Sequence, residues 1–205
     1  MGRAELPLGL QASEFGRGEA QQQVHGGEKM GHVDELRSLI EPLVREVPDF
    51  PTAGVLFRDL TRLFADPTGF RTVVDKLAAV APVVDIVAGV EARGFLLGAA
   101  VGYARGTGIV GVRKPGRLPV VADRESYTLE YGATVLELAD GALGPGQRVL
   151  VIDDVLATGG TIAAACALVD RAGAEVVGIG VVMEIAALGG RGVLVDRPLQ
   201  ALLTV

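Results

Sequence analysis

The chain has little histidine and little cysteine, the side chains that most often carry nucleophilic catalysis or hold transition metals. The single cysteine, Cys166, excludes an internal disulfide and a cysteine-based metal cluster, which fits a reducing compartment. Both histidines, His25 and His32, lie in a stretch rich in Gly, Gln and Glu that shows no sustained hydrophobic period. We therefore expect residues 1–32 to form a disordered N-terminal extension. The folded body would then lack histidine, which argues against a Ser-His-Asp or Cys-His hydrolase and against a His-ligated zinc site.

Long hydrophobic runs and an excess of positive charge are also missing. No apolar run reaches the roughly 18 residues of a membrane-spanning helix, and the N-terminus lacks a continuous apolar signal-peptide core. We expect a cytoplasmic protein without a membrane partner. The 19 Lys and Arg residues are outnumbered by 25 Asp and Glu residues, so the net charge is −6. This balance argues against a nucleic-acid partner, because such binding rests on Lys and Arg neutralising phosphates. A small local anion site remains compatible with it.

What the chain does contain is an alternation of strand-like and helix-like segments. With 205 residues, of which 49% are apolar, it suffices for one α/β domain, which we assign to residues 33–205. Helical spacing predicts a helix over residues 33–47 that Pro42 should kink or split. Asp66 followed by Pro67 is typical of a helix start, with Asp as N-cap. The other expected segments are strands at 84–90, 108–114, 133–139, 148–154 and 175–185, helices at 95–105 and 161–173, and a long polar segment without a core face at 115–132. This order predicts a doubly wound, mainly parallel sheet flanked by helices.

The most informative stretch is VLVIDDVLATGGT, residues 149–161. It predicts a strand that ends in two acids, followed by a turn and a helix start. Ligands of open parallel sheets bind beyond the carboxyl ends of the strands, and helix N-termini favour anions. Asp153 and Asp154 would accept hydrogen bonds from sugar hydroxyls, and the backbone of residues 157–161 would bind a phosphate. The alternative is an ordinary strand–turn–helix capped by threonine, which leaves the adjacent acids unexplained.

The same stretch resembles the phosphoribosyl pyrophosphate signature of the type I phosphoribosyltransferases. Five further pieces resemble the adenine-using members of that family, from about Val33 to Val205: DFPTAGVLFRDLT, VAGVEARGFLLG, VRKPGRLP, YTLEYG and VVMEIAALGGR. The resemblance implies transfer of a phosphoribosyl group to adenine, giving AMP and pyrophosphate. It also implies Mg²⁺ held mainly through substrate and water, a homodimer, and a fold with a small hood and a flexible lid loop.

The resemblance further implies roles for individual residues. Those implied in phosphoribosyl pyrophosphate binding are Glu91, Ala92, Arg93, Arg113, Lys114, Tyr131, Asp153, Asp154, Ala157, Thr158, Gly159, Gly160 and Thr161, with Arg117 and Tyr127 as additional candidates. Those implied in adenine binding are Leu56, Phe57, Arg58 and Ile185. From the residues alone, Arg93 could also be an exposed surface arginine, Arg113, Lys114 and Arg117 could equally belong to a solvated strand end, and the apolar members of the adenine set could be ordinary core.

Glu130, in the lid candidate YTLEYG, is the expected catalytic residue. With no histidine expected in the body, a carboxylate is the best available proton handler. Three alternatives stay open at this point. The chain could be a phosphoribosyltransferase for another purine base, a non-catalytic regulator that senses phosphoribosyl pyrophosphate, or an unrelated nucleotide-binding α/β protein.

Overall fold

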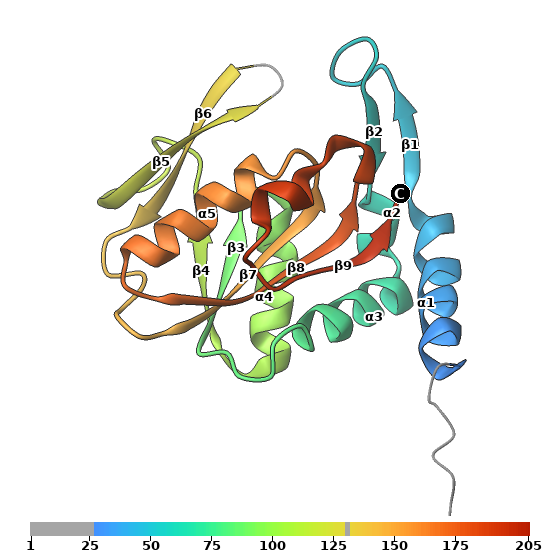
Figure 1. Cartoon of the computed structure of the whole chain (residues 1–205), viewed down its shortest axis with the longest axis horizontal. Coiled ribbons are helices and arrows are strands. Elements are labelled where there is room, and N and C mark those ends of the chain that lie inside the picture. The colour runs from blue at the N-terminus through green and yellow to red at the C-terminus, as the bar shows by residue number, and fades with distance from the viewer. Residues whose placement is uncertain (1–26, 130–131) are drawn as a thin grey trace, which may run out of the picture.

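The computed structural model describes residues 27–129 and 132–205, and its centre is a five-stranded parallel sheet (Figure 1). The strand order is β4-β3-β7-β8-β9. The strands are β3 (Ile86–Val90), β4 (Gly108–Val112), β7 (Arg148–Leu156), β8 (Glu175–Glu184) and β9 (Leu199–Thr204). Strands β3, β7 and β8 are buried along almost their whole length, as expected for parallel strands covered on both faces. The predicted fold class is confirmed.

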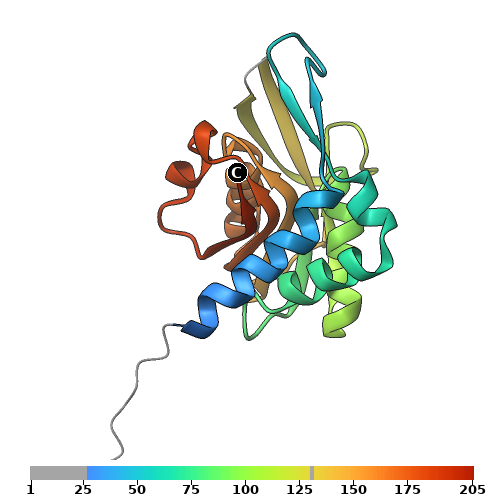
Figure 2. The same ribbon diagram turned by 90° about the vertical axis from the view of Figure 1, so that its right-hand side faces the viewer.

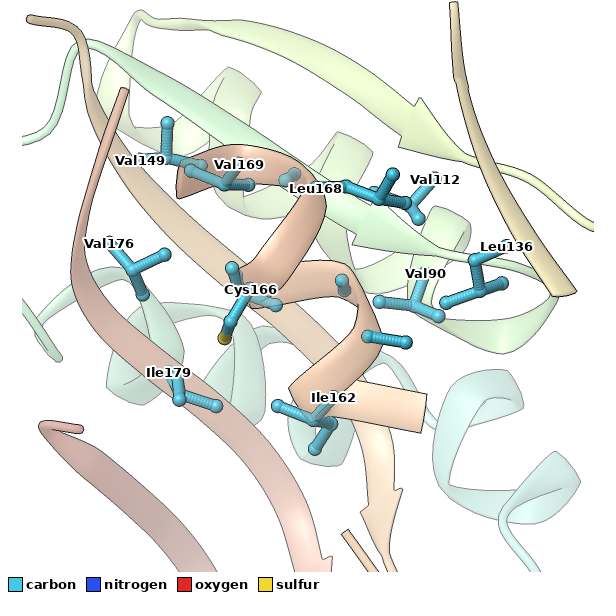
Figure 3. Close-up of a cluster of buried hydrophobic side chains, with 14 of the residues drawn as sticks. Val90, Val112, Leu136, Val149, Ile162, Cys166, Leu168, Val169, Val176 and Ile179 are labelled. Atoms are coloured by element: carbon cyan, nitrogen blue, oxygen red, sulfur yellow. The ribbon is translucent and has the colours of Figure 1, made fainter. Parts of the chain in front are cut away.

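Helices cover the two faces of the sheet, and β7 contributes to the core on each face. Alternate β7 residues Leu150 and Ile152 pack with α3 (Pro67–Ala78) and α4 (Arg93–Arg105). Val149 and Val151 face α5 (Gly160–Arg171) on the other side. Figure 3 shows this second cluster, in which Cys166 of α5 lies among apolar side chains. Burial raises the pKa of the Cys166 thiol to about 11, so this cysteine acts as a small core residue.

The start of α3 forms as predicted. The Asp66 carboxylate accepts a hydrogen bond from the Gly69 N–H at 2.6 Å, and Pro67 occupies the first turn. A short helix, α2 (Thr61–Ala65), precedes it, and two 3₁₀ helices follow β8, η2 (Ala186–Leu188) and η3 (Gly190–Leu194). No helix in the described ranges is long and apolar enough to cross a membrane.

The N-terminal region differs from the expectation. Helix α1 (Gly27–Ile40) starts inside the predicted extension and lies along the β9 edge of the sheet (Figure 2), where the Arg37 guanidinium donates to the Thr204 carbonyl at 2.9 Å. Residues 1–26 lie outside the described residues. The helix ends at Ile40 and does not reach residue 47, because Pro42 limits the chain to one 3₁₀ turn, η1 (Glu41–Leu43).

Two antiparallel hairpins extend from the sheet domain. Strands β1 (Arg45–Pro48) and β2 (Leu56–Asp59) form the first, and β5 (Val121–Leu129) and β6 (Gly132–Ala139) form the second. In Figure 1 they stand at the top, on either side of the edge where the sheet strands end. The polar segment at 115–132 therefore contains a nine-residue strand. Hydrophobic periodicity did not predict this strand, because burial of an apolar face is not what holds it. Backbone pairing to β6 and ion pairs from Arg171 to Asp123 and Glu125 hold it instead.

Candidate functional site

The site lies at the carboxyl edge of the sheet, where the strand order changes direction. The chain runs from β3 outward to β4, and from β7 outward in the opposite direction to β8 and β9. Pairing between β3 and β7 stops at Gly89 and Ile152, whereas β7 stays paired with β8 up to Leu156. The sheet therefore opens between β3 and β7 at residue 153, the type of position where open α/β sheets bind ligands.

Asp153 and Asp154 are buried at this opening, with 7% and 6% of their surfaces exposed. We expected them at the end of the strand, but β7 continues to Leu156, and what ends at this point is the pairing with β3. The Asp153 carboxylate accepts a hydrogen bond from the Asp154 N–H at 2.8 Å. Burial, followed by the neighbouring Asp154 charge, raises the pKa of Asp153 well above its usual value. Two buried acids side by side are costly unless a cation or a ligand compensates them, so this pair marks a candidate functional site.

Arg93, at the start of α4, brings three parts of the chain together. Its guanidinium lies 2.8 Å from Oδ2 of Asp154 without hydrogen-bond alignment, and that buried oxygen accepts no hydrogen bond. Arg93 also lies 5.2 Å from the centre of the Phe57 ring and donates to the Arg58 carbonyl at 3.4 Å. The peptide bond between Glu91 and Ala92, just before it, is cis. Arg93 is thus a bridge between the acid pair and the β1–β2 hairpin, and the surface-arginine alternative is wrong.

Glu91 contacts both residues expected beside the pyrophosphate, the guanidinium of Arg113 and the backbone of Lys114. Its carboxylate accepts hydrogen bonds from the Arg113 guanidinium at 3.0 Å and from the Lys114 backbone N–H at 2.8 Å. Burial raises the pKa of Glu91, but these two bonds outweigh it and the net pKa is below the usual value. Arg113 also stacks on Phe95, 5.2 Å from the ring centre. Arg117 is exposed nearby in sequence, and its predicted role stays a prediction.

The loop from Ala157 to Thr161 follows β7 and opens α5. Gly159 is the N-cap residue in the left-handed region, at φ +86°, and no side chain caps the helix. The threonine-capped turn considered above is therefore wrong, and the first N–H groups of α5 face the edge of the sheet as a potential anion site.

The predicted adenine residues come from two elements that face this edge. Leu56 is 44% exposed, and Phe57 is half-buried with its ring edge-on to Phe50 at 5.1 Å. Arg58 forms an ion pair with Glu46 across the hairpin. Ile185 is half-buried just after β8, and its N–H donates to the Leu156 carbonyl at 2.9 Å. None of the three apolar residues belongs to the core, so the core-packing alternative is wrong for them.

Some predicted residues are not tested by this geometry, and some features were missed. Glu130 and Tyr131 lie outside the described residues. Tyr127 is half-buried on β5 and packs against the α5 side of the core. The sequence reasoning assigned nothing to Glu184, Gly190 and Arg191, although the segment VVMEIAALGGR contains all three. The adjacent glycines and the acid at the end of an apolar run were the available signal.

An open parallel sheet with a buried acid pair and an uncapped helix N-terminus at its switch point is the arrangement expected of the type I phosphoribosyltransferases. Residues 82–194 match the phosphoribosyl transferase domain family. The chain belongs to the adenine phosphoribosyltransferases within that family.

The assignment to this family rests on the similarity to the following relatives. The adenine phosphoribosyltransferase of Saccharopolyspora erythraea is 61% identical over 170 residues, covering 83% of this chain and 92% of the relative. That of Clavibacter sepedonicus is 57% identical, covering 82% and 87%. Among solved structures, the adenine phosphoribosyltransferase of Thermoanaerobacter pseudethanolicus has a TM-score of 0.79 and 40% identity, covering 84% of this chain and 99% of that one. The Saccharomyces cerevisiae enzyme, solved with adenine and an imino-altritol bisphosphate, has a TM-score of 0.77 and 35% identity, covering 83% and 99%.

Proposed function

We propose that this protein transfers the 5-phosphoribosyl group from phosphoribosyl pyrophosphate to adenine, giving AMP and pyrophosphate. The observation that carries the proposal is the buried Asp153–Asp154 pair at the sheet opening, with an arginine opposite and a helix N-terminus beside it. The identity to adenine phosphoribosyltransferases over more than four fifths of the chain supports adenine as the base.

The acid pair and the loop bind different parts of the ribose phosphate. The 157–161 loop binds the 5′-phosphate through backbone N–H groups and threonine hydroxyls, as helix N-termini bind anions. Asp153 and Asp154 accept hydrogen bonds from the ribose hydroxyls. Oδ2 of Asp154 lies 2.8 Å from Arg93 but accepts no hydrogen bond, and this supports the role, because a buried carboxylate oxygen without an aligned donor gains from a ligand hydroxyl.

Arg93 changes partners when substrate binds. Without substrate it neutralises Asp154 at 2.8 Å. A diphosphate offers it a stronger, bidentate partner, and the released carboxylate then takes the sugar hydroxyls. Glu91, two residues before Arg93, holds the Arg113 guanidinium at 3.0 Å.

Adenine binds between the hairpin and the loop after β8. Phe57 and Leu56 on one side and Ile185 on the other are the apolar walls, and backbone groups at Leu56 and Arg58 recognise the base edge. The related Saccharomyces cerevisiae enzyme was solved in complex with adenine, which supports the choice of base.

Asp153 and Asp154 are the residues that would hold Mg²⁺ together with the substrate. No group of three His, Cys, Asp or Glu residues able to hold a metal occurs in the part of the chain that the structure describes. The donors that are present, two adjacent carboxylates, fit a hydrated Mg²⁺ that reaches them through water and substrate oxygens. The ion supplies charge neutralisation of the diphosphate, and the chain's own residues orient the sugar and exclude water.

Glu130 is the proposed catalytic residue and Tyr131 a proposed contact of the diphosphate; in the sequence both lie between β5 and β6, outside the described residues. The carboxylate manages a proton on the purine or stabilises charge on the ribose, while the hairpin keeps water from the electrophilic sugar. Glu130→Gln should lower turnover by roughly 10²–10⁴ with the affinity for phosphoribosyl pyrophosphate little changed. Turnover within about twofold of wild type would remove Glu130 from the mechanism and leave the hairpin only water exclusion.

A homodimer in the cytoplasm completes the proposal. Exposed apolar residues Leu96 and Tyr103 on α4, at 57% and 91%, and Ile109 on the edge strand β4, at 43%, support a second copy of the chain as partner. Sedimentation of the purified chain measures the mass directly.

The deciding experiment measures pyrophosphate release with adenine, guanine, hypoxanthine and xanthine. Adenine should be preferred by a wide margin. Equal turnover with hypoxanthine would instead favour a phosphoribosyltransferase for another purine base. Binding of phosphoribosyl pyrophosphate without turnover on any base would favour a sensing regulator.

A further inference from the structure

Two loops that follow neighbouring strands touch at the edge of the sheet. Strands β7 and β8 are parallel and adjacent, and their last paired residues are Leu156 and Glu184. The loop after β7 is the predicted phosphate loop, residues 157–161. The loop after β8 begins with Ile185, a predicted adenine contact, and runs through η2 into η3. The expected contacts to the base and to the phosphate thus come from adjacent loops.

Gly190 is the point where these loops meet, backbone against backbone. A methyl group added at Gly190 would overlap the Ala157 carbonyl oxygen and lie 2.8 Å from the Gly159 nitrogen. In the reverse direction, a methyl group at Gly159 would lie 2.5 Å from the Gly190 carbonyl oxygen. Both separations are shorter than real Cβ contacts, and the opposing atoms are backbone. The position of Gly190 therefore sets the position of the phosphate loop.

An ion pair fixes the residue next to Gly190. The Arg191 guanidinium donates to both oxygens of the buried Glu184 carboxylate, at 3.0, 3.2 and 2.6 Å, and to the Leu199 carbonyl on β9 at 3.4 Å. The other end of the loop is held by the Ile185 N–H, which donates to the Leu156 carbonyl at 2.9 Å. Because both ends are anchored to the sheet, Gly190 cannot move away from Ala157 without breaking the ion pair.

We propose that Glu184, Gly190 and Arg191 form a brace that positions the phosphate loop relative to the base wall at Ile185. The inference rests on the proposed function, since it takes the 157–161 loop as the 5′-phosphate site. The brace sets the distance between the base and phosphate contacts, and so favours a ligand that spans both, a purine nucleoside 5′-monophosphate, over the nucleoside alone. These three are positioning residues, and none of them has to touch the substrate.

The test compares the affinities for AMP and adenosine, which differ only in the phosphate. Gly190→Ala in the full chain should reduce the preference for AMP over adenosine at least about fivefold, because a displaced loop loses charge-assisted hydrogen bonds to the phosphate. Gly192→Ala is the matched control: Gly192 lies two residues on in the same 3₁₀ helix, and a methyl group there meets nothing within 4 Å. The control should keep the wild-type preference.

The outcomes separate the brace from a general loss of structure and from failure of the proposed function. The proposal would be overturned if the AMP preference of folded Gly190→Ala fell by less than about fivefold. It would also be overturned if the AMP preference of Gly192→Ala fell as much as that of Gly190→Ala. If Gly190→Ala does not fold, Arg191→Met decides: its AMP preference should fall at least about threefold below that of Arg191→Lys, which keeps one charged contact to Glu184. Equal preference in those two variants would overturn it as well. A wild-type protein that binds AMP no better than adenosine would instead contradict the proposed function.

Discussion

The ion pair between Arg93 and Asp154 links the acid pair to the β1–β2 hairpin, and a double-mutant cycle measures what it contributes to stability. The Arg93 side chain is 34% exposed and that of Asp154 is 9% exposed. Breaking a fully buried pair costs about 3–5 kcal/mol, whereas an exposed pair is worth about 0–1 kcal/mol. The observed exposure lies between these cases, so Arg93→Met should destabilise the fold by about 2 kcal/mol through the stranded carboxylate.

The contact of Arg93 with the Phe57 ring adds to this cost. At 5.2 Å from the ring centre it is within cation–π range, worth about 0.5–1 kcal/mol. In an Asp154→Asn background there is no uncompensated carboxylate, so the cost of Arg93→Met comes mainly from the lost contact with Phe57. The coupling free energy of the Arg93→Met and Asp154→Asn pair should therefore be about 1–2 kcal/mol. Urea unfolding followed by circular dichroism gives the four free energies that the cycle needs.

Arg71→Met is the control for loss of an arginine. Arg71 lies on the exposed side of α3, away from the acid pair, and its replacement should change the free energy of unfolding by less than about 0.5 kcal/mol. A coupling free energy below about 0.5 kcal/mol, or an Arg93→Met effect no larger than that of Arg71→Met, would refute the role assigned to the pair.

The acid pair and one surface pair give predictions that depend on pH. Asp153→Asn should raise the melting temperature at pH 8 and lower turnover at least about tenfold. The folded state raises the pKa of Asp153, so ionisation at high pH costs stability; the gain should vanish at low pH, and a lower melting temperature at pH 8 would contradict this. Asp85→Asn should lower the melting temperature at pH 7. Hydrogen bonds from Arg148 lower the pKa of Asp85 to about 2, so the difference from wild type should close as the pH falls from about 4 to about 2; a constant difference would speak against this.

Much of the fold followed from local patterns. The cap at Asp66 and Pro67 formed as predicted, since a side-chain cap depends on residues within one turn. The buried strands were recognisable because parallel strands covered on both faces are continuous apolar runs. The strands that were missed are β1, β2, β5 and β9. Strands β1 and β2 have four residues each and β5 is polar, and a partner strand supplies the hydrogen bonds of all four. Hydrophobic periodicity does not report this backbone pairing.

The acid pair shows the same division within the site. The sequence indicated that Asp153 and Asp154 follow a strand and precede a phosphate-binding turn. It did not indicate that β7 continues to Leu156, because the register with β8 decides where the strand ends. Nor did it indicate that Arg93 rests on Asp154 in this state.

The sequence by itself therefore determined the fold class and the chemistry of the edge: two acids, a glycine turn and a helix start, all contained within thirteen residues. These features are local, and the resemblance of the signature carried them. Only the tertiary structure decided the contacts between distant segments, such as Arg93 against Asp154 and Gly190 against Ala157. Such contacts arise because adjacent parallel strands deliver their following loops to the same edge, and the order of strands in the sheet is a property of the whole fold.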